Sequence, residues 1–294
     1  MAPHQHFTII AHRGDSSAAP ENTVQAFDAA LQQGFCNFET DCQLSSDGTV
    51  VIVHDEQLGR VNNGQGAVAE HTWAQLEQLD AGSWFGAAFA GARMPTLQQV
   101  LERYRGKAHI HLELKSQQPQ LPAAAATLLE QHGWHNMQSA SSHTAQAAAG
   151  NQQPGNTSSD AGAAGSIPRA EAAAGDATPA AAHAFSVPGL TITSFHLQQL
   201  QASKQMLPAV PHGWLIQEVS SELVDQAAAC GFEMLCARAN ALSAEGVQLA
   251  RSRGLAVRAW GVRTLELLHH VVRCGADGAT VNWPAKAANA LQDA

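Results

Sequence analysis

Short apolar runs, many of them rich in valine and isoleucine, alternate with amphipathic stretches along almost the whole chain. The runs predict strands, and apolar residues three and four positions apart predict helices. The predicted strands are 7–11, 36–40, 50–54, 109–114, 190–195, 214–219, 232–236, 255–260 and 278–282. The predicted helices are 22–33, 96–105, 120–132, 197–206, 221–230, 243–253 and 264–273, with Asn22, Thr96, Ser243 and Thr264 as expected N-caps. This alternation predicts a parallel sheet, and the number of strands favours a closed (β/α)8 TIM barrel over an open sheet.

The segment 36–54 complicates this count, because nine strands are predicted for the eight places in a barrel. Its Ser-Ser-Asp-Gly turn at 45–48 leaves no room for a helix between two extended runs. We therefore expect the chain to run back in extended form here before the next parallel strand begins.

Two segments fall outside the alternation and predict insertions in a single domain that spans 1–294. Residues 56–94 follow the third strand and are rich in glycine and aromatic residues. They predict a small excursion that packs on the rest of the domain and acts as a lid or binding loop. Residues 138–187 precede the fifth strand and consist largely of Ala, Gly, Ser and Pro. Because they offer few large apolar side chains to bury, we expect a disordered surface insertion that the chemistry does not need.

Composition narrows the class of protein. The formal charge of −9 argues against a general binder of nucleic acid or of anionic membranes, which would need a basic face. The five cysteines form no CxxC pair and are expected to be reduced thiols. The stretch MAPHQHFTII lacks the features of a signal peptide, and no apolar run is long enough to span a bilayer, so a cytoplasmic protein is expected. The oligomeric state is left open.

Polar side chains gather where the predicted strands end. These groups are His12 and Arg13, Glu39 and Asp41, His54 and Asp55, Glu113 and Lys115, and Trp260. In a parallel barrel the strand ends share one face, where such barrels place their chemistry. Each group alone has a plainer explanation, such as a rim salt bridge, a hydrogen-bonded histidine or a core tryptophan. Four charged clusters on one face would nevertheless leave many buried charges uncompensated unless a ligand or a metal ion binds there.

The charges of this set indicate its chemistry. Glu39, Asp41 and Glu113 form a hard oxygen site, which prefers Mg²⁺, Mn²⁺ or Ca²⁺ to Zn²⁺. Arg13 and Lys115 are cations suited to phosphate oxygens, and the guanidinium can bind two oxygens at once. The set therefore predicts a site for a divalent ion and a phosphate.

His12 and His54 supply acid–base groups on the same face. An imidazole can accept or donate a proton near neutral pH. Two imidazoles beside two cations and a divalent ion suit displacement at phosphorus, in which Arg13 holds the phosphate while His12 moves a proton beside it.

A series of motifs resembles a known family. AHRG, PENT, ETDCQLSSDGTVVIVHD, GQGAVAEHTWAQLEQLDAGSWFG, MPTLQQVL, HLELK, TSF and AWGV occur in this order along the chain. Together they resemble the glycerophosphodiester phosphodiesterase family, with the bacterial cytoplasmic type as the best match, and cover nearly the whole chain except 138–187. The resemblance implies hydrolysis of small-molecule diesters such as glycerophosphocholine and glycerophosphoethanolamine to glycerol 3-phosphate and an alcohol.

The resemblance also implies roles for individual residues. Glu39, Asp41 and Glu113 would bind one divalent cation, Mg²⁺ or Ca²⁺ with Mn²⁺ as a further option. His12 and His54 would be the acid–base pair, and Arg13 and Lys115 would bind phosphate. The substrate pocket would be lined by Trp84, Phe85, Phe195 and Trp260. Segment 56–94 would be a small inserted subdomain that covers the glycerol part of the site. In PENT, Glu21 and Asn22 are expected to cap the helix or to support the site. The nucleophile is either water or the glycerol 2-hydroxyl, which would give a cyclic phosphate.

The chain departs from the family pattern on one side of the barrel. AWGV stands where the family usually has Trp-Thr followed by Val and Asn, and TVNWP lacks the acidic residue that often precedes the proline. The headgroup preference is therefore left open. The nearest alternative is an enzyme of the same fold that acts on lysophospholipids or phosphoinositides, since Trp84 and Phe85 could form an apolar mouth. The other alternative is a barrel that binds phosphodiesters without turnover.

Overall fold

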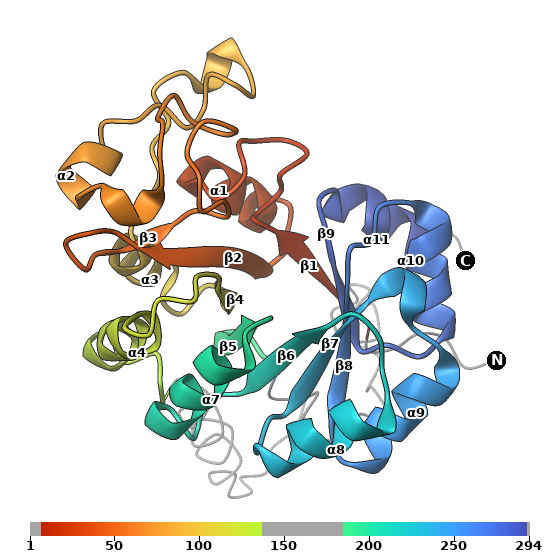
Figure 1. Ribbon diagram of the computed structural model, residues 1–294. Helices are drawn as coiled ribbons and strands as arrows, with labels where there is room; N and C mark the ends of the chain where they lie inside the picture. Colours follow the sequence, from red (N-terminus) through yellow and green to blue (C-terminus); the bar gives the residue numbers. More distant parts are fainter. Residues whose placement is uncertain (1–6, 137–184, 293–294) are drawn as a thin grey trace, which may run out of the picture.

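A closed parallel barrel forms the body of the molecule (Figure 1). The computed structural model describes residues 7–136 and 185–292. The barrel strands are β1 (Thr8–His12), β2 (Asn37–Leu44), β4 (His109–Leu114), β5 (Gly189–Ser194), β6 (His212–Ile216), β7 (Met234–Arg238), β8 (Ala256–Trp260) and β9 (Gly278–Val281). Each pairs in parallel with its neighbour, and β1 pairs with both β2 and β9, which closes the sheet. The predicted (β/α)8 TIM barrel is confirmed.

The ninth strand, β3 (Val50–Ile52), lies outside the barrel and runs antiparallel to the second half of β2. Cys42 pairs with Ile52, and the Ser45 backbone N–H donates to the Thr49 carbonyl across the turn. The extended return expected in 36–54 is therefore confirmed. The prediction that the second strand ends at 40 is wrong, because pairing with β3 continues β2 to Leu44.

Helices surround the barrel (Figure 1). They are α1 (Val24–Gln32), α3 (Leu97–Tyr104), α4 (Leu121–Gln131), α7 (Leu197–Met206), α8 (Ser221–Ala229), α9 (Ala244–Ser252), α10 (Leu265–Arg273) and α11 (Pro284–Gln292), the last of which was not predicted. Short helices are η1 (Val68–Glu70), α2 (Trp73–Leu76), η2 (Ala87–Phe89) and η3 (Ala239–Ala241). None of the helices in the described residues is long and apolar enough to cross a membrane.

The N-caps agree with the sequence except at α1. Thr96, Ser243 and Thr264 each accept a hydrogen bond from the third residue of their helix, as predicted. The prediction that Asn22 caps α1 is wrong, because Thr23 takes that place and accepts from the Ala26 backbone N–H. Asn22 instead lies in the left-handed region with φ 57°, and its side chain points to β2.

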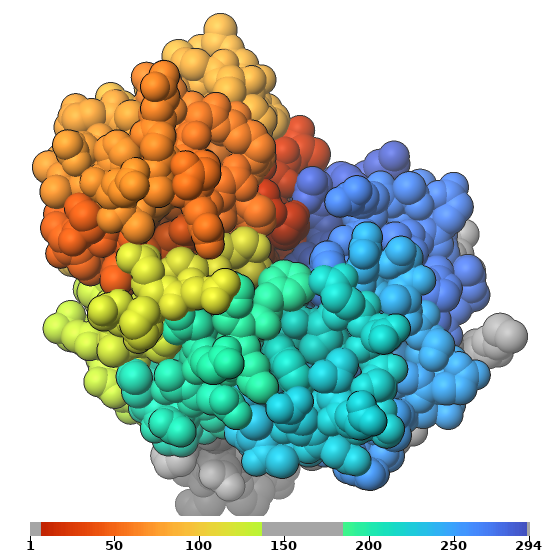
Figure 2. Space-filling model, in the orientation of Figure 1, coloured from red at the N-terminus to blue at the C-terminus, as the bar shows by residue number. Residues whose placement is uncertain are grey.

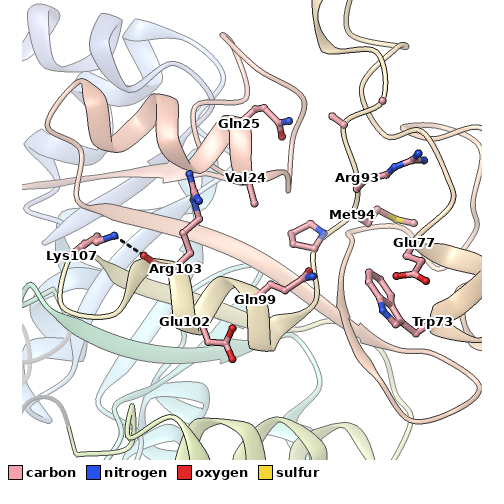
Figure 3. Close-up of a pocket in the computed structure, with 13 residues that line it drawn as sticks. Val24, Gln25, Trp73, Glu77, Arg93, Met94, Gln99, Glu102, Arg103 and Lys107 are labelled. Atoms are coloured by element: carbon pink, nitrogen blue, oxygen red, sulfur yellow. Dashed lines mark hydrogen bonds between the residues drawn. The ribbon is translucent and has the colours of Figure 1, made fainter.

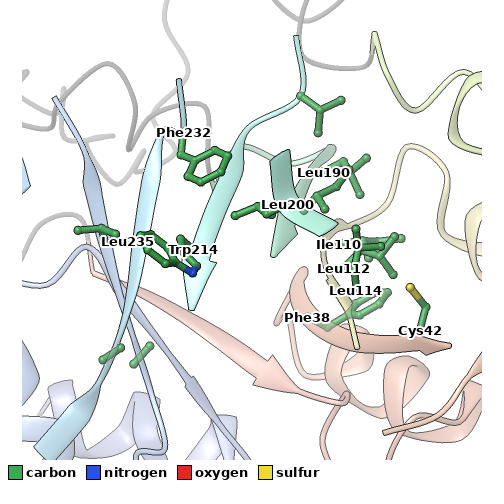
Figure 4. Close-up of a cluster of buried hydrophobic side chains, with 14 of the residues drawn as sticks. Phe38, Cys42, Ile110, Leu112, Leu114, Leu190, Leu200, Trp214, Phe232 and Leu235 are labelled. Atoms are coloured by element: carbon green, nitrogen blue, oxygen red, sulfur yellow. The ribbon is translucent and has the colours of Figure 1, made fainter. Parts of the chain in front are cut away.

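The main apolar core lies between the outer face of the strands and the helices. Figure 4 shows side chains of β2, β4, β5, β6 and β7 that meet in this layer, with Leu200 of α7 among them. The Phe38 ring stacks on Phe27 of α1 at 4.6 Å and meets the edge of Tyr104 of α3 at 5.2 Å. All five cysteines are free thiols, as predicted.

Residues 56–94 form a small unit whose core is completed by Val51 and Val53, from β3 and the residue just after it. That core consists of Val51, Val53, Leu58, Val68, Leu76, Ala81 and Met94, with Trp73 and Leu79 packed against it. In the space-filling view the segment stands as an orange-to-tan block at one side of the barrel (Figure 2). Of the predicted insertion 138–187, residues up to 184 lie outside the described residues, whereas the Phe185 ring packs 5.6 Å from the ring of His111.

Buried histidines line the amino-terminal end of the barrel. His109 opens β4, is fully buried and donates from Nδ1 to the Ser186 carbonyl at 2.6 Å, while the Thr191 hydroxyl lies 2.9 Å from its Nε2. Burial lowers the pKa of His109 from 6.5 to about 4, and burial also lowers the pKa of His212 on β6 to about 3. Both imidazoles are therefore neutral parts of the fold at neutral pH.

These histidines predict a loss of stability in mild acid. Between pH 6.5 and about 4 the unfolded chain binds a proton at His109 that the folded chain does not, so the contribution present above pH 6.5 is lost as the pH falls. His109 alone should cost about 2 kcal/mol of unfolding free energy at pH 5 relative to pH 7. Urea unfolding at several pH values from 5 to 8 measures the slope of the free energy of unfolding against pH. His109→Gln should flatten it, and an unchanged slope would contradict the assignment.

Candidate active site at the carboxyl end of the barrel

A cavity of about 540 Å³ lies at the carboxyl ends of the strands. Of the predicted site residues, it is lined by His12, Arg13, Glu39, His54, Glu113, Lys115, Phe195 and Trp260. Asp41 lies within reach of this set through its ion pairs with Arg13 and Lys115. The structure does not bring Trp84 and Phe85 into the cavity, since their rings pack edge to face with each other at 5.6 Å within the 56–94 unit.

Three carboxylates meet on the inner face of two neighbouring strands. Asp41 of β2 pairs laterally with Glu113 of β4, and Glu39 lies two residues earlier on the same face of β2. One oxygen atom from each lies within 4.8 Å of the other two, and all three side chains are buried. This spacing allows the three residues to hold one metal ion.

The electrostatics of these carboxylates fit a bound cation. Burial, followed by the charge of Asp41, raises the pKa of Glu113 to about 7 and raises the pKa of Glu39 well above its ordinary value. Burial opposes ionisation of Asp41 too, but the charges of Arg13 and Lys115 outweigh it and lower the pKa of this carboxyl. Asp41 Oδ1 is buried and has no hydrogen-bond donor among the described residues. A bound cation would reduce the charge repulsion among the three carboxylates, and Asp41 Oδ1 could serve as one of its ligands.

The turn after β1 aims Arg13 at the carboxylates. Arg13 has φ 58° and Gly14 has φ 79°, and a Cβ on Gly14 would lie 2.5 Å from the carbonyl carbon of Ala26 in α1. The turn therefore requires glycine. The Arg13 backbone N–H donates to Glu39 Oε2 at 3.1 Å, and its guanidinium Nε lies 3.2 Å from Asp41 Oδ2.

Lys115, which follows β4, forms the second cation of the site. Its Nζ lies 2.9 Å from Glu113 Oε1 and 3.7 Å from Asp41 Oδ1. Although burial opposes its charge, these two carboxylates raise the pKa of Lys115. It therefore remains an ammonium at neutral pH.

In both candidate acid–base histidines, the ring nitrogen that makes the orienting hydrogen bond is Nδ1. His12 Nδ1 donates to the Asn282 Oδ1 amide oxygen at 2.6 Å, and His54 Nδ1 donates to Asp55 Oδ1 at 2.6 Å. Nε2 of each ring is therefore available for proton transfer in the neutral tautomer. Burial, followed by the charge of Arg13, lowers the pKa of His12 to about 4, and burial also lowers the pKa of His54.

Glu21, Asn22 and Arg60 hold the site residues Arg13 and Asp41 in place. The sequence indicated a supporting role for Glu21 and Asn22 but not for Arg60. Asn22 Nδ2 donates to Asp41 Oδ2 at 2.8 Å, which is the supporting role left open for PENT. Glu21 accepts from Arg13 Nη1 at 2.7 Å and from both terminal nitrogens of Arg60, which lies in the 56–94 unit and also binds Asp55. Arg60 thus joins the partner of Arg13 to the partner of His54.

Arg258 of β8 is a further residue that the sequence analysis missed. It is 1% exposed and lines the cavity, and its Nε and Nη1 atoms have no hydrogen-bond partner among the described residues. Its positive charge opposes the rise in the pKa of Glu39 and Glu113. The signal was a charged residue within the apolar run LAVRAW.

A larger cavity of about 750 Å³ lies between α1, α3 and the 56–94 unit (Figure 3). It contains none of the predicted site residues. Its basic side chains are engaged in the fold: Arg103 binds Asp28, and Lys107 donates to the Arg103 carbonyl. The smaller cavity is therefore the candidate active site.

Known proteins resemble this chain at both the sequence and the structure level. A glycerophosphodiester phosphodiesterase from Caldanaerobacter subterraneus subsp. tengcongensis is 46% identical over 109 residues, which is 37% of this chain and 45% of the relative. One from Bacillus subtilis is 39% identical over 115 residues, 36% of this chain and 39% of the relative. The matched part thus spans less than half the length of these curated relatives.

Solved structures share the fold over nearly the whole chain. A phosphodiesterase from Oleispira antarctica, in complex with the product sn-glycerol-3-phosphate, matches with a TM-score of 0.75 and 24% identity over 98% of each chain. A glycerophosphodiester phosphodiesterase from Agrobacterium tumefaciens matches with a TM-score of 0.69 and 24% identity, covering 96% of this chain and 99% of the other.

A family model decides the assignment. The glycerophosphoryl diester phosphodiesterase model matches residues 12–153 and 178–286, which is more than half of the chain and includes every metal, phosphate and acid–base candidate. The chain therefore belongs to the glycerophosphoryl diester phosphodiesterase family.

Proposed function

We propose that this protein hydrolyses glycerophosphodiesters to glycerol 3-phosphate and an alcohol. The observation that carries the proposal is the convergence of three buried carboxylates, two cations and two oriented imidazoles on one cavity. The names of the relatives and the glycerol 3-phosphate bound to the Oleispira antarctica protein support the same reaction.

Glu39, Asp41 and Glu113 would hold one divalent cation, Mg²⁺ or Ca²⁺ with Mn²⁺ as a further option. An all-carboxylate donor set suits these hard ions, and the fold supplies no thiolate or imidazole among the three. Such an ion, when bound, withdraws electron density from a phosphate oxygen and stabilises the charge that develops there.

Arg13 and Lys115 would bind the remaining phosphate oxygens. Both lie beside Asp41 at the edge of the carboxylate set, so a phosphate that meets them also lies next to the ion site. One histidine would take a proton from the nucleophile through Nε2, and the other would give one to the leaving alcohol oxygen. The pKa values of both histidines are lowered, so both imidazoles are neutral at neutral pH and able to accept a proton.

A release assay tests this function. Glycerol 3-phosphate is measured enzymatically after incubation with glycerophosphocholine, glycerophosphoethanolamine and lysophosphatidylcholine, with EDTA and with each ion added back. We expect metal-dependent release from the deacylated diesters. Faster turnover of lysophosphatidylcholine would favour the lysophospholipid alternative, and binding without release would favour the non-catalytic barrel. A 2,3-cyclic phosphate detected by ³¹P NMR would identify the glycerol 2-hydroxyl as the nucleophile.

Removal of the Arg60 side chain should weaken turnover without affecting the metal. Arg60 is one of two partners of Glu21, the other being Arg13, and one of two partners of Asp55, the other being His54. Arg60→Met leaves each carboxylate with a single partner, so Arg13 and His54 are held less firmly. We expect kcat to fall by about 10-fold to 100-fold, within the range found when outer partners of a site are removed. Steady-state kinetics measure it, and Arg253→Met, which breaks a surface pair with Asp225, is the control. An equal loss in both variants would contradict the positioning role.

A further inference from the structure

The lining of the candidate active site carries more basic than acidic side chains, in an otherwise acidic protein. The basic residues that line it are Arg13, Arg60, Lys115, Arg258 and Arg263, against the acidic Glu21, Glu39 and Glu113. Glu21 is engaged by two of the guanidinium groups, and the other two carboxylates belong to the metal-ion set. The cavity lining therefore offers no free carboxylate to a cationic headgroup, although the chain carries a formal charge of −9.

Arg263 is the exposed basic residue of the lining that the fold leaves without a partner in the described part of the chain, whereas Arg258 is buried. Arg263 lies in the loop between β8 and α10, its side chain is exposed, and it has no hydrogen bond or ion pair with another described residue. Arg13 and Lys115 are committed to the carboxylates and the phosphate, and Arg60 is committed to Glu21 and Asp55. Arg263 can therefore meet a group on the ligand beyond the phosphate.

Each aromatic ring of the cavity lies close to a basic side chain. Three rings line it, and a basic nitrogen or guanidinium carbon lies near the centre of each: Lys115 at 5.6 Å from Phe195, Arg238 at 5.8 Å from Trp260, and Lys286 at 5.7 Å from Trp283. Recognition of a quaternary ammonium group uses open aromatic faces. Phe195 and Trp260 also pack edge to face with each other at 5.1 Å, so part of each ring surface already contacts protein groups.

We propose that the preferred substrate is a glycerophosphodiester whose alcohol carries an anionic group, and that Arg263 determines this preference. The inference rests on the proposed function and adds the substrate class. An anionic headgroup would meet Arg263 at the edge of the cavity while the diester phosphate lies on Arg13 and Lys115. A choline or ethanolamine headgroup would meet the same exposed guanidinium, with no free carboxylate in the cavity lining to bind it.

Three diesters of graded headgroup charge test the proposal: glycerophosphoinositol 4-phosphate, glycerophosphoinositol and glycerophosphocholine. The wild-type kcat/KM should fall in that order, with about tenfold between the first two, as expected for one added charge contact. Added salt should reduce the difference, because exposed charges are screened. Arg263→Glu should abolish or reverse the order. Arg273→Glu makes the same charge change in the last turn of α10 and should leave the order unchanged.

Two results would overturn the proposal: glycerophosphocholine as the best substrate, or an Arg263→Glu variant with the wild-type order. If none of the diesters is hydrolysed, the proposed function fails, and the headgroup preference is then read from the dissociation constants of the same three diesters by calorimetry. The same order of affinity, lost in Arg263→Glu, would support the preference without turnover, and affinities independent of headgroup charge would contradict it.

Discussion

Replacing His12 or His54 with Ala lowers the turnover of a glycerophosphodiester by about 10²–10⁴-fold, the usual loss when a positioned general acid or base is removed. Each ring is anchored through Nδ1, to Asn282 and to Asp55 respectively, so Nε2 is the atom that moves the proton. Alanine removes that atom and leaves the metal-ion carboxylates in place. KM should change little, because neither ring is needed to hold the phosphate.

The leaving group separates the two roles. A diester with a p-nitrophenyl leaving group needs little protonation, so it should restore most of the activity of the variant that lacks the general acid. The variant that lacks the base stays slow with either substrate. His269→Ala, on the outer helix α10, controls for the loss of an imidazole outside the site. A loss of less than tenfold in both site variants would refute the acid–base assignment.

Replacing Glu113 with Gln raises the concentration of divalent ion needed for half-maximal activity by at least about tenfold. The change removes the charge of one of three oxygen ligands, and ligands or their close supports commonly affect metal affinity by about 10–100-fold. The apo fold should tolerate the change, because the pKa of Glu113 is raised to about 7 and glutamine resembles the protonated acid. The effect is therefore one on binding rather than on folding.

Thermal unfolding checks this result independently of activity. An ion that binds only the folded state raises the melting temperature according to its affinity. The rise on adding Mg²⁺ or Ca²⁺ should be clear in the wild type and smaller in Glu113→Gln. Glu102→Gln, a change on the exposed side of α3 where the side chain is 52% exposed, should behave as the wild type. Equal metal dependence in all three proteins would remove Glu113 from the ligand set.

The periodicity of the sequence was sufficient for the barrel, because strands and helices depend on local spacing. It also placed the candidate chemistry at the strand ends, since parallel strands bring those ends to one face. The antiparallel β3 was foreseen for the same local reason: a four-residue turn between two extended runs leaves space only for a return.

The orientation of side chains in the barrel strands was not readable from the sequence. These strands are buried on both faces, so hydrophobic alternation does not tell which residue points inward. Arg258 illustrates this, because its charge stood out in an apolar run while its position in the cavity depended on the closed sheet. The aromatic pair Trp84 and Phe85 shows the reverse. The family resemblance implied that both line the substrate pocket, but they do not line the cavity and their rings pack on each other within the 56–94 unit.

The sequence by itself determined the strands of the barrel, most of the helices around it, their order and the residue types at the strand ends, because these follow from patterns between near neighbours in the chain. Tertiary structure alone decided that Asn22 supports Asp41 rather than capping α1, and that Arg60 reaches Glu21 from 39 residues away. The physical reason is that such bonds form only after the barrel has closed and the 56–94 unit has packed, so no local pattern encodes them.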